Sequence, residues 1–236
     1  MKPHILMLLG LTVASTACED ISSSDLLTSG MSAVVYGTAE GEDSTRVMVE
    51  LRAGGRLSNT MVDLQGDDEL VATSGEQSVT LQKQSLGDYH NYVGNLTGGE
   101  EDMAVNVALL RTVDQGAPAS TFTLPAPFAF DTSGDAISPT QNLAFTWSPA
   151  NTNDDMEVVI DGDCILPWSK ELDGDPGSFE IPGEEIEPVG EQGESCSVEV
   201  KLRRVRGGQL DAAFEEGGLV QGRQLRTFEA TWSDGA

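Results

Sequence analysis

Few residues in this sequence could support catalysis. Only two histidines occur, and His4 lies in an N-terminal segment that we expect to be removed. A Ser-His-Asp triad would therefore have to use His90, which lies in a predicted strand with no Gly-x-Ser-x-Gly motif near it. The chain also has no phosphate-binding loop and no dinucleotide-binding glycine motif. A half-exposed strand histidine is the simpler interpretation of His90. We assign no catalytic residue, expect no cofactor and predict a protein that is not an enzyme.

Two acidic turns are the best candidates for metal binding. Asp161-Gly162-Asp163 and Asp173-Gly174-Asp175 place carboxylates two residues apart around a flexible glycine, which suits the oxygen ligands that Ca²⁺ prefers. Neither turn extends into an EF-hand loop, and one histidine in the mature chain excludes a histidine-rich zinc site. Acids are so frequent that no carboxylate pair stands out for glycoside hydrolysis. We interpret both turns as solvated acids and assign no metal ligand, with calcium binding as an alternative.

The first 17 residues are typical of a secretion signal. Lys2 supplies the positive start, residues 5–13 form a short apolar run, and Ala14-Ser15-Thr16-Ala17 supplies small residues for cleavage. The apolar run is too short to span a bilayer, which needs roughly 20 apolar residues. Residues 1–17 are therefore predicted to be a signal peptide, and the mature protein is predicted to be exported.

The signal-peptide prediction also accounts for the number of cysteines. Three cysteines leave an odd one, which in an exported protein needs an explanation. Cys18 lies at the predicted cleavage point and can carry a lipid. Cys164 and Cys196 then remain as a pair, in a compartment where disulfides persist. Both fall on the apolar side of their predicted strands, so we predict a disulfide between them.

Short runs of alternating apolar and polar residues occupy most of the mature chain. In residues 46–51, for example, apolar side chains at every second position give the pattern of a half-buried strand. Glycine-rich and acidic clusters separate the runs, and many short strands at this spacing indicate β-sandwiches. The predicted strands are Ala33–Thr38, Arg46–Leu51, Thr60–Leu64, Glu69–Thr73, Ser78–Leu81, Tyr89–Leu96, Met103–Leu110, Leu143–Trp147, Met156–Ile160, Phe179–Ile181, Cys196–Leu202 and Leu225–Trp232.

Two breaks in the pattern set the predicted domain organisation. Residues 18–30 are polar and serine-rich and lack the apolar surface that offsets ordering entropy, so we expect a flexible, lipid-anchored tether. Residues 117–127 are rich in proline and alanine, and we place a domain boundary there. The prediction is an all-β protein with two β-sandwich domains in tandem, of immunoglobulin or fibronectin-like type, over 31–122 and 123–236. A turn or two of helix is expected only near 211–216.

The charge of the chain restricts its partners. The formal net charge is -26, from 39 acidic and 13 basic residues. Such a chain repels nucleic acid and anionic membrane surfaces, so membrane contact should come from a lipid. Six basic residues nevertheless gather between positions 201 and 226. They could bind an acidic partner such as an anionic polysaccharide, but we prefer pairing with neighbouring acids on an exposed sheet. This basic cluster comprises Lys201, Arg203, Arg204, Arg206, Arg223 and Arg226.

Two parts of the sequence resemble known bacterial proteins. Ser15-Thr16-Ala17-Cys18 resembles the lipobox of lipoprotein signal peptides, in which the cysteine is lipidated and becomes the new N-terminus. Ser15 stands in place of the usual leucine, so ordinary cleavage after Ala17 is the alternative. Residues 123–128, 143–149 and 177–182 resemble two-domain, immunoglobulin-like envelope lipoproteins of Gram-negative bacteria. The resemblance implies a lipoprotein of the cell envelope, periplasmic or at the cell surface, with its lipid, such as palmitate, on Cys18.

These patterns predict a structural or interaction role. The sandwich domains would present a surface to an unknown protein or polysaccharide partner, with the membrane contacted through the lipid and no nucleic acid bound. The alternative function is a carbohydrate- or calcium-binding β-sandwich module.

Overall fold

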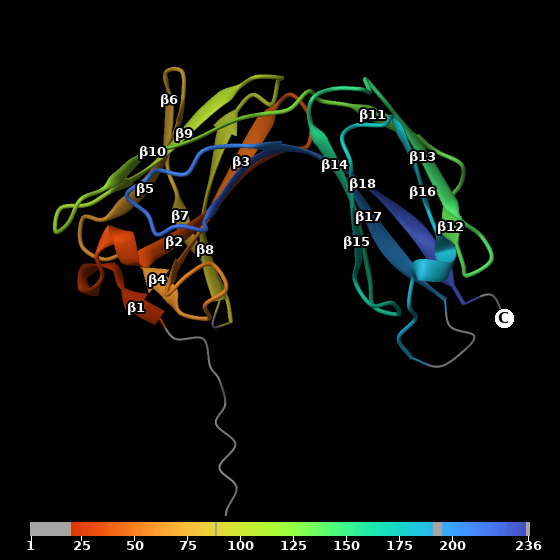
Figure 1. Cartoon of the computed structure of the whole chain (residues 1–236), viewed down its shortest axis with the longest axis horizontal. Helices are drawn as coiled ribbons and strands as arrows, with labels where there is room; N and C mark the ends of the chain where they lie inside the picture. The colour runs from red at the N-terminus through yellow and green to blue at the C-terminus, as the bar shows by residue number, and fades with distance from the viewer. Residues whose placement is uncertain (1–19, 88, 191–194, 235–236) are drawn as a thin grey trace, which may run out of the picture.

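The structure is a computed structural model, and it describes residues 20–234 except for residue 88 and residues 191–194 (Figure 1). The predicted signal peptide and Cys18 therefore lie outside the described residues. The described chain is all-β, as predicted, and every strand predicted from the alternation overlaps an observed one. The only helical elements in this part of the chain are three 3-10 turns, Ser23–Asp25, Thr28–Gly30 and Gly183–Glu185. None of the described helices is long and apolar enough to cross a membrane.

Eighteen strands are described. The first ten are β1 (Asp20–Ser22), β2 (Met31–Ala39), β3 (Ser44–Ala53), β4 (Met61–Asp63), β5 (Glu69–Ser74), β6 (Gln77–Thr80), β7 (Gln82–Leu86), β8 (Tyr89–Thr97), β9 (Ala104–Leu110) and β10 (Ala117–Thr123). The others are β11 (Ala129–Thr132), β12 (Ala136–Ile137), β13 (Leu143–Ser148), β14 (Asp155–Gly162), β15 (Trp168–Leu172), β16 (Ser178–Ile181), β17 (Ser195–Gly207) and β18 (Leu219–Ser233).

These strands form three sheets. The largest has eleven strands in the order β1-β4-β3-β2-β18-β17-β14-β15, with β12 beside β18 and the β7–β8 pair beside β3. A four-stranded sheet, β10-β9-β5-β6, packs on the β2 and β3 part of the large sheet through one hydrophobic cluster. A three-stranded sheet, β11-β13-β16, packs on the β14 and β17 part through a second cluster. Figure 1 shows these two parts as two lobes, the first with the four-stranded sheet and the second with the three-stranded sheet. The long strands of the large sheet connect them.

Strand β18 belongs to both lobes. Its residues Leu219–Gln224 pair in parallel with β2, and residues 221–233 pair antiparallel with β17. Val220 packs in the first cluster, whereas Ala230 and Trp232 pack in the second. Residues an even number of positions apart point to the same face of a strand. Both small sheets therefore cover the same face of the large sheet, and no described sheet covers the opposite face.

Residues 20–30 differ from the expected flexible tether. β1 pairs in parallel with β4, and Ser23 and Thr28 are buried. The fully buried Arg111 guanidinium donates hydrogen bonds to the backbone oxygens of Ser23 (2.5 Å) and Leu26 (3.0 Å). Buried backbone groups need such partners. A distant arginine therefore allows this polar segment to pack, and local composition could not reveal it.

Two other local expectations also differ from the structure. The proline-rich segment contains β10, an edge strand whose register shifts around Pro118, and proline is tolerated at edges and bulges. Residues 211–216 form turns instead of a helix, and Phe214 packs in the first cluster. The chain after residue 123 thus returns to the first lobe before β18 begins. The division into two sandwich domains at this boundary stays a prediction.

Candidate functional site

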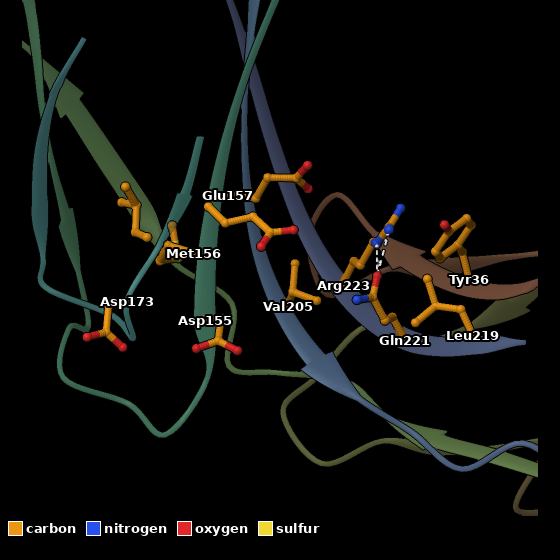
Figure 2. Close-up of a pocket in the computed structure, with 11 residues that line it drawn as sticks. Tyr36, Asp155, Met156, Glu157, Asp173, Val205, Leu219, Gln221 and Arg223 are labelled. Atoms are coloured by element: carbon orange, nitrogen blue, oxygen red, sulfur yellow. Dashed lines mark hydrogen bonds between the residues drawn. The ribbon is translucent and has the colours of Figure 1, made fainter. Parts of the chain in front are cut away.

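A groove of about 630 Å³ opens where the two lobes meet (Figure 2). Strand register brings its walls together, because Arg223 on β18 lies beside Val205 on β17, which lies beside Asp155 on β14. These odd-numbered side chains lie on the uncovered face of the large sheet. The lining residues are Tyr36, Asp155, Met156, Glu157, Glu171, Leu172, Asp173, Val205, Leu219, Gln221 and Arg223.

The second-lobe wall of the groove is acidic. Asp155 and Glu157 come from β14, Glu171 from β15 and Asp173 from the turn that follows. Glu157 lies opposite Glu171 in the strand register and forms an ion pair with Arg203 at 3.1 Å. Within the described residues, the other three carboxylates have no basic partner within ion-pair distance. This wall therefore presents uncompensated negative charge.

The first-lobe wall presents one cation held on an aromatic ring. The Arg223 guanidinium carbon lies 3.6 Å from the centroid of the Tyr36 ring. Gln221 Oε1 accepts hydrogen bonds from Nε (3.1 Å) and Nη2 (2.6 Å) of the same guanidinium. Burial lowers the pKa of Arg223 and the nearby Arg203 lowers it too, but Tyr36 and Glu157 oppose them, and arginine stays protonated. Stacking and hydrogen bonding fix this charge in one place.

Arg206 links the two lobes on the covered face of the large sheet, opposite the groove. It follows Val205 on β17 and donates hydrogen bonds to both carboxylate oxygens of Asp154 (2.6 and 3.0 Å), which precedes β14. The same guanidinium donates to the Asp102 carboxylate (2.6 Å) and the Leu124 backbone oxygen (3.0 Å), both next to the first lobe. The hydrogen bonds that Arg206 donates to Asp154 and Asp102 keep its pKa raised despite its partial burial. This side chain thus links the two lobes on the face opposite the groove.

Arg204, on the other side of Val205, is fully buried. It pairs with the equally buried Asp175 at 3.1 Å and donates a hydrogen bond to the Ala126 backbone oxygen (2.8 Å). Burial alone would raise the pKa of Asp175. Hydrogen bonds from Trp147 and Thr152, together with the charge of Arg204, lower it overall. Asp175 is therefore an ionised structural carboxylate inside the second lobe.

The basic cluster largely pairs with neighbouring acids, as we preferred. Lys201 lies 2.8 Å from Asp161, and Arg203 and Arg206 pair as described above. Among the described residues, Arg223 and Arg226 have no acid within ion-pair distance and lie over the rings of Tyr36 and Phe128. Arg204 pairs with Asp175 but is buried instead of exposed. It shares the even parity of Val198 and Leu202 on β17, which are core residues, so the alternation already carried this signal.

One carboxylate of each acidic turn is engaged by other side chains. Asp161 is engaged by Lys201, and Asp175 by Arg204, Trp147 and Thr152. Among the described residues, no group of three or more acidic, histidine or cysteine side chains could hold a metal ion.

His90 is buried, so the expectation of a half-exposed side chain is wrong. Its Nε2 lies 3.1 Å from the Val62 backbone oxygen, and its Nδ1 lies 3.4 Å from the Asp20 carboxylate. The sequence pattern missed this because β1 and β4, which cover the ring, come from other parts of the chain.

The structure contains the predicted disulfide. Cys164 and Cys196 are bonded, with 6.0 Å between their Cα atoms. Cys164 packs in the second hydrophobic cluster and Cys196 lies against it, in agreement with the predicted parity. Cys18 lies outside the described residues.

Comparisons with known proteins add little to this description. No protein-family model and no curated protein matches the sequence. Among solved structures, the chain is similar to the adhesin InvE of Yersinia pseudotuberculosis, with 14% identity and a TM-score of 0.24. The match covers 86% of this chain and 60% of that one, so the chain spans less than two thirds of the adhesin structure. A TM-score this low assigns neither a fold nor a function.

Proposed function

We propose that the protein is a cell-envelope lipoprotein that binds a protein partner through the groove between its lobes, and that it is not an enzyme. In this proposal each lobe is an immunoglobulin-like β-sandwich, and a lipid on Cys18 holds the protein to a membrane. The disulfide supports export, since such bonds persist in oxidising compartments.

The groove is the observation that carries the proposed interaction role. Its walls come from strands of both lobes, and the backbone pairing of β14, β17, β18 and β2 fixes those walls relative to each other. A site held on rigid strands keeps its shape in the absence of a ligand, which lowers the entropic cost of binding. We found no comparable arrangement around His90, whose ring is enclosed by strands.

The charge of the groove selects the partner. Its lining holds four carboxylates, Asp155, Glu157, Glu171 and Asp173, against one arginine. We therefore infer that the partner contributes an extended polypeptide segment with lysine or arginine side chains that face the acidic wall. The fixed Arg223 on the opposite wall would meet a carboxylate or backbone oxygen of the same segment. An anionic polysaccharide fits this surface poorly, because the acidic wall repels it.

Binding of a synthetic peptide of alternating lysine and threonine, measured by calorimetry at low salt, tests the proposal. The variant Glu171→Gln/Asp173→Asn removes two unpaired groove carboxylates and should weaken binding by about tenfold. The control Asp67→Asn/Glu76→Gln removes the same charge from exposed positions of the first lobe and should leave affinity unchanged. Equal weakening by both variants would mean non-specific attraction to an acidic chain. Preferential binding of an anionic polysaccharide to the groove would contradict the inferred partner.

A further inference from the structure

The end of the first lobe that carries the N-terminus has unusual exposed leucines. Leu57, in the connection between β3 and β4, is 87% exposed, and Leu86, at the end of β7, is 83% exposed. These are the two most exposed large hydrophobic side chains of the described chain. Single exposed leucines are common on soluble proteins. These two leucines differ from such cases because both lie near the start of the described chain.

Contacts place both leucines at one end of the lobe. Leu86 pairs with Tyr89 in the strand register, and the Arg52 guanidinium lies 5.8 Å from the Tyr89 ring. Arg52 also donates a hydrogen bond to the backbone oxygen of Ser58, the residue that follows Leu57. Arg52 thus links the β3–β4 connection, which carries Leu57, to the β7–β8 hairpin, which carries Leu86; we call these two segments the tips.

The start of the described chain lies at this same end. Asp20 is next to Met61 in the register of β1 and β4, and Met61 pairs with Arg52. The Asp20 carboxylate also lies 3.4 Å from the ring of His90, which neighbours Tyr89. In Figure 1, β1 and the end of the β7–β8 hairpin both lie along the lower side of the first lobe.

The distance from Cys18 to the folded lobe is short. Two peptide units separate Cys18 from Asp20, and they span at most about 7 Å. Because residues 20–30 pack against the lobe and do not act as a tether, a lipid on Cys18 would bring the tips to the bilayer surface. On the premise of the lipid anchor, we propose that Leu57 and Leu86 insert into the membrane interface and dock the first lobe on the bilayer.

The local charges permit this contact despite the net charge of -26. Three acids near the tips are paired, Asp20 and Asp63 with Lys83, and Glu50 with Arg52. Arg56, exposed beside Leu57, supplies a cation at the level of lipid phosphates. Apolar side chains flanked by a basic residue are suited to the boundary between headgroups and acyl chains.

Site-specific fluorescence on the full lipidated protein tests the docking. The native cysteines are a lipid site and a disulfide, so Leu57→Cys and Leu86→Cys would each supply one free thiol for an environment-sensitive dye. The protein is placed in vesicles of phosphatidylethanolamine and phosphatidylglycerol, with a nitroxide lipid as quencher. Glu76→Cys is the control, because Glu76 is exposed in the β5–β6 turn, on the upper side of the same lobe in Figure 1.

We expect a blue-shifted emission and quenching by the nitroxide lipid at positions 57 and 86, and neither at position 76. Labels at 57 and 86 that behave like the label at 76, on protein that stays with the vesicles, would overturn the docking and leave the anchor intact. Wild-type protein found in the soluble fraction with an unmodified Cys18 would overturn both the anchor and the docking. Thermal melting identical to wild type confirms that each labelled variant is folded.

Discussion

The buried pair of Arg204 and Asp175 makes the most specific prediction about stability. Arg204→Met keeps a long side chain but removes the charge from a position where both partners have no exposed side-chain surface. Removal of one member of a buried ion pair costs about 3–5 kcal/mol, because the other charge stays buried without compensation. Hydrogen bonds from Trp147 and Thr152 continue to stabilise Asp175, which places the expected cost at the lower end, about 3 kcal/mol.

This loss translates into a measurable change in melting temperature. For a chain of this size, each kcal/mol shifts the midpoint by about 2–4 °C, so Arg204→Met should melt about 6–12 °C below wild type. Circular dichroism at neutral pH measures the midpoint. Lys201→Met is the matched control, because it removes a cation from a partly exposed pair on the same strand, worth only about 0–1 kcal/mol.

The double variant Arg204→Met/Asp175→Asn separates charge from packing. It leaves no unpaired charge, so it should recover part of the stability lost in Arg204→Met. If Arg204→Met melts at the same temperature as Lys201→Met, the buried pair does not stabilise the second lobe as described. If the double variant is less stable than Arg204→Met, the cost comes from lost contacts and not from the charge left on Asp175.

Three further predictions concern the whole chain. Replacement of Cys164 and Cys196 by alanine opens a loop with a sequence separation of 32. It should lower the free energy of unfolding, measured with urea, by about 3–4 kcal/mol in the chain-entropy model. A loss below about 1 kcal/mol would show that the disulfide contributes little. The lowered pKa of Asp175 means that its ionised form stabilises the fold above the ordinary aspartate pKa, and that this stability is lost as pH falls through the folded value; wild type should therefore lose stability below about pH 4 more steeply than Asp175→Asn, and parallel pH curves would refute this. The fold should also melt at a higher temperature in about 1 M NaCl than in about 10 mM NaCl. The electrostatic screening length falls from about 30 Å to about 3 Å between these concentrations, which relieves repulsion within a chain of net charge -26. A level or lower melting temperature with chelator present would contradict the charge argument.

The alternation of residue types determined much of this protein. Side chains at every second position specified the strands, since one face of each strand must be buried. The same parity placed Cys164 and Cys196 against the second cluster and led to the disulfide. It also marked Arg204 as buried, although its charge led us to group it with the exposed arginines.

Only the tertiary structure decided how these strands combine. The parallel pairing of β18 with β2 joins residues far apart in the chain, so no local sequence pattern predicts it. The same holds for residues 20–30. Their polar composition predicted a tether, but Arg111, which follows β9 and lies far away in the sequence, donates hydrogen bonds to their backbone. The groove depends on both kinds of information. The sequence shows the acidic residues of the groove. That they lie opposite Tyr36 and Arg223 follows from strand pairing between distant parts of the chain, which depends on burial and hydrogen bonding over the entire fold.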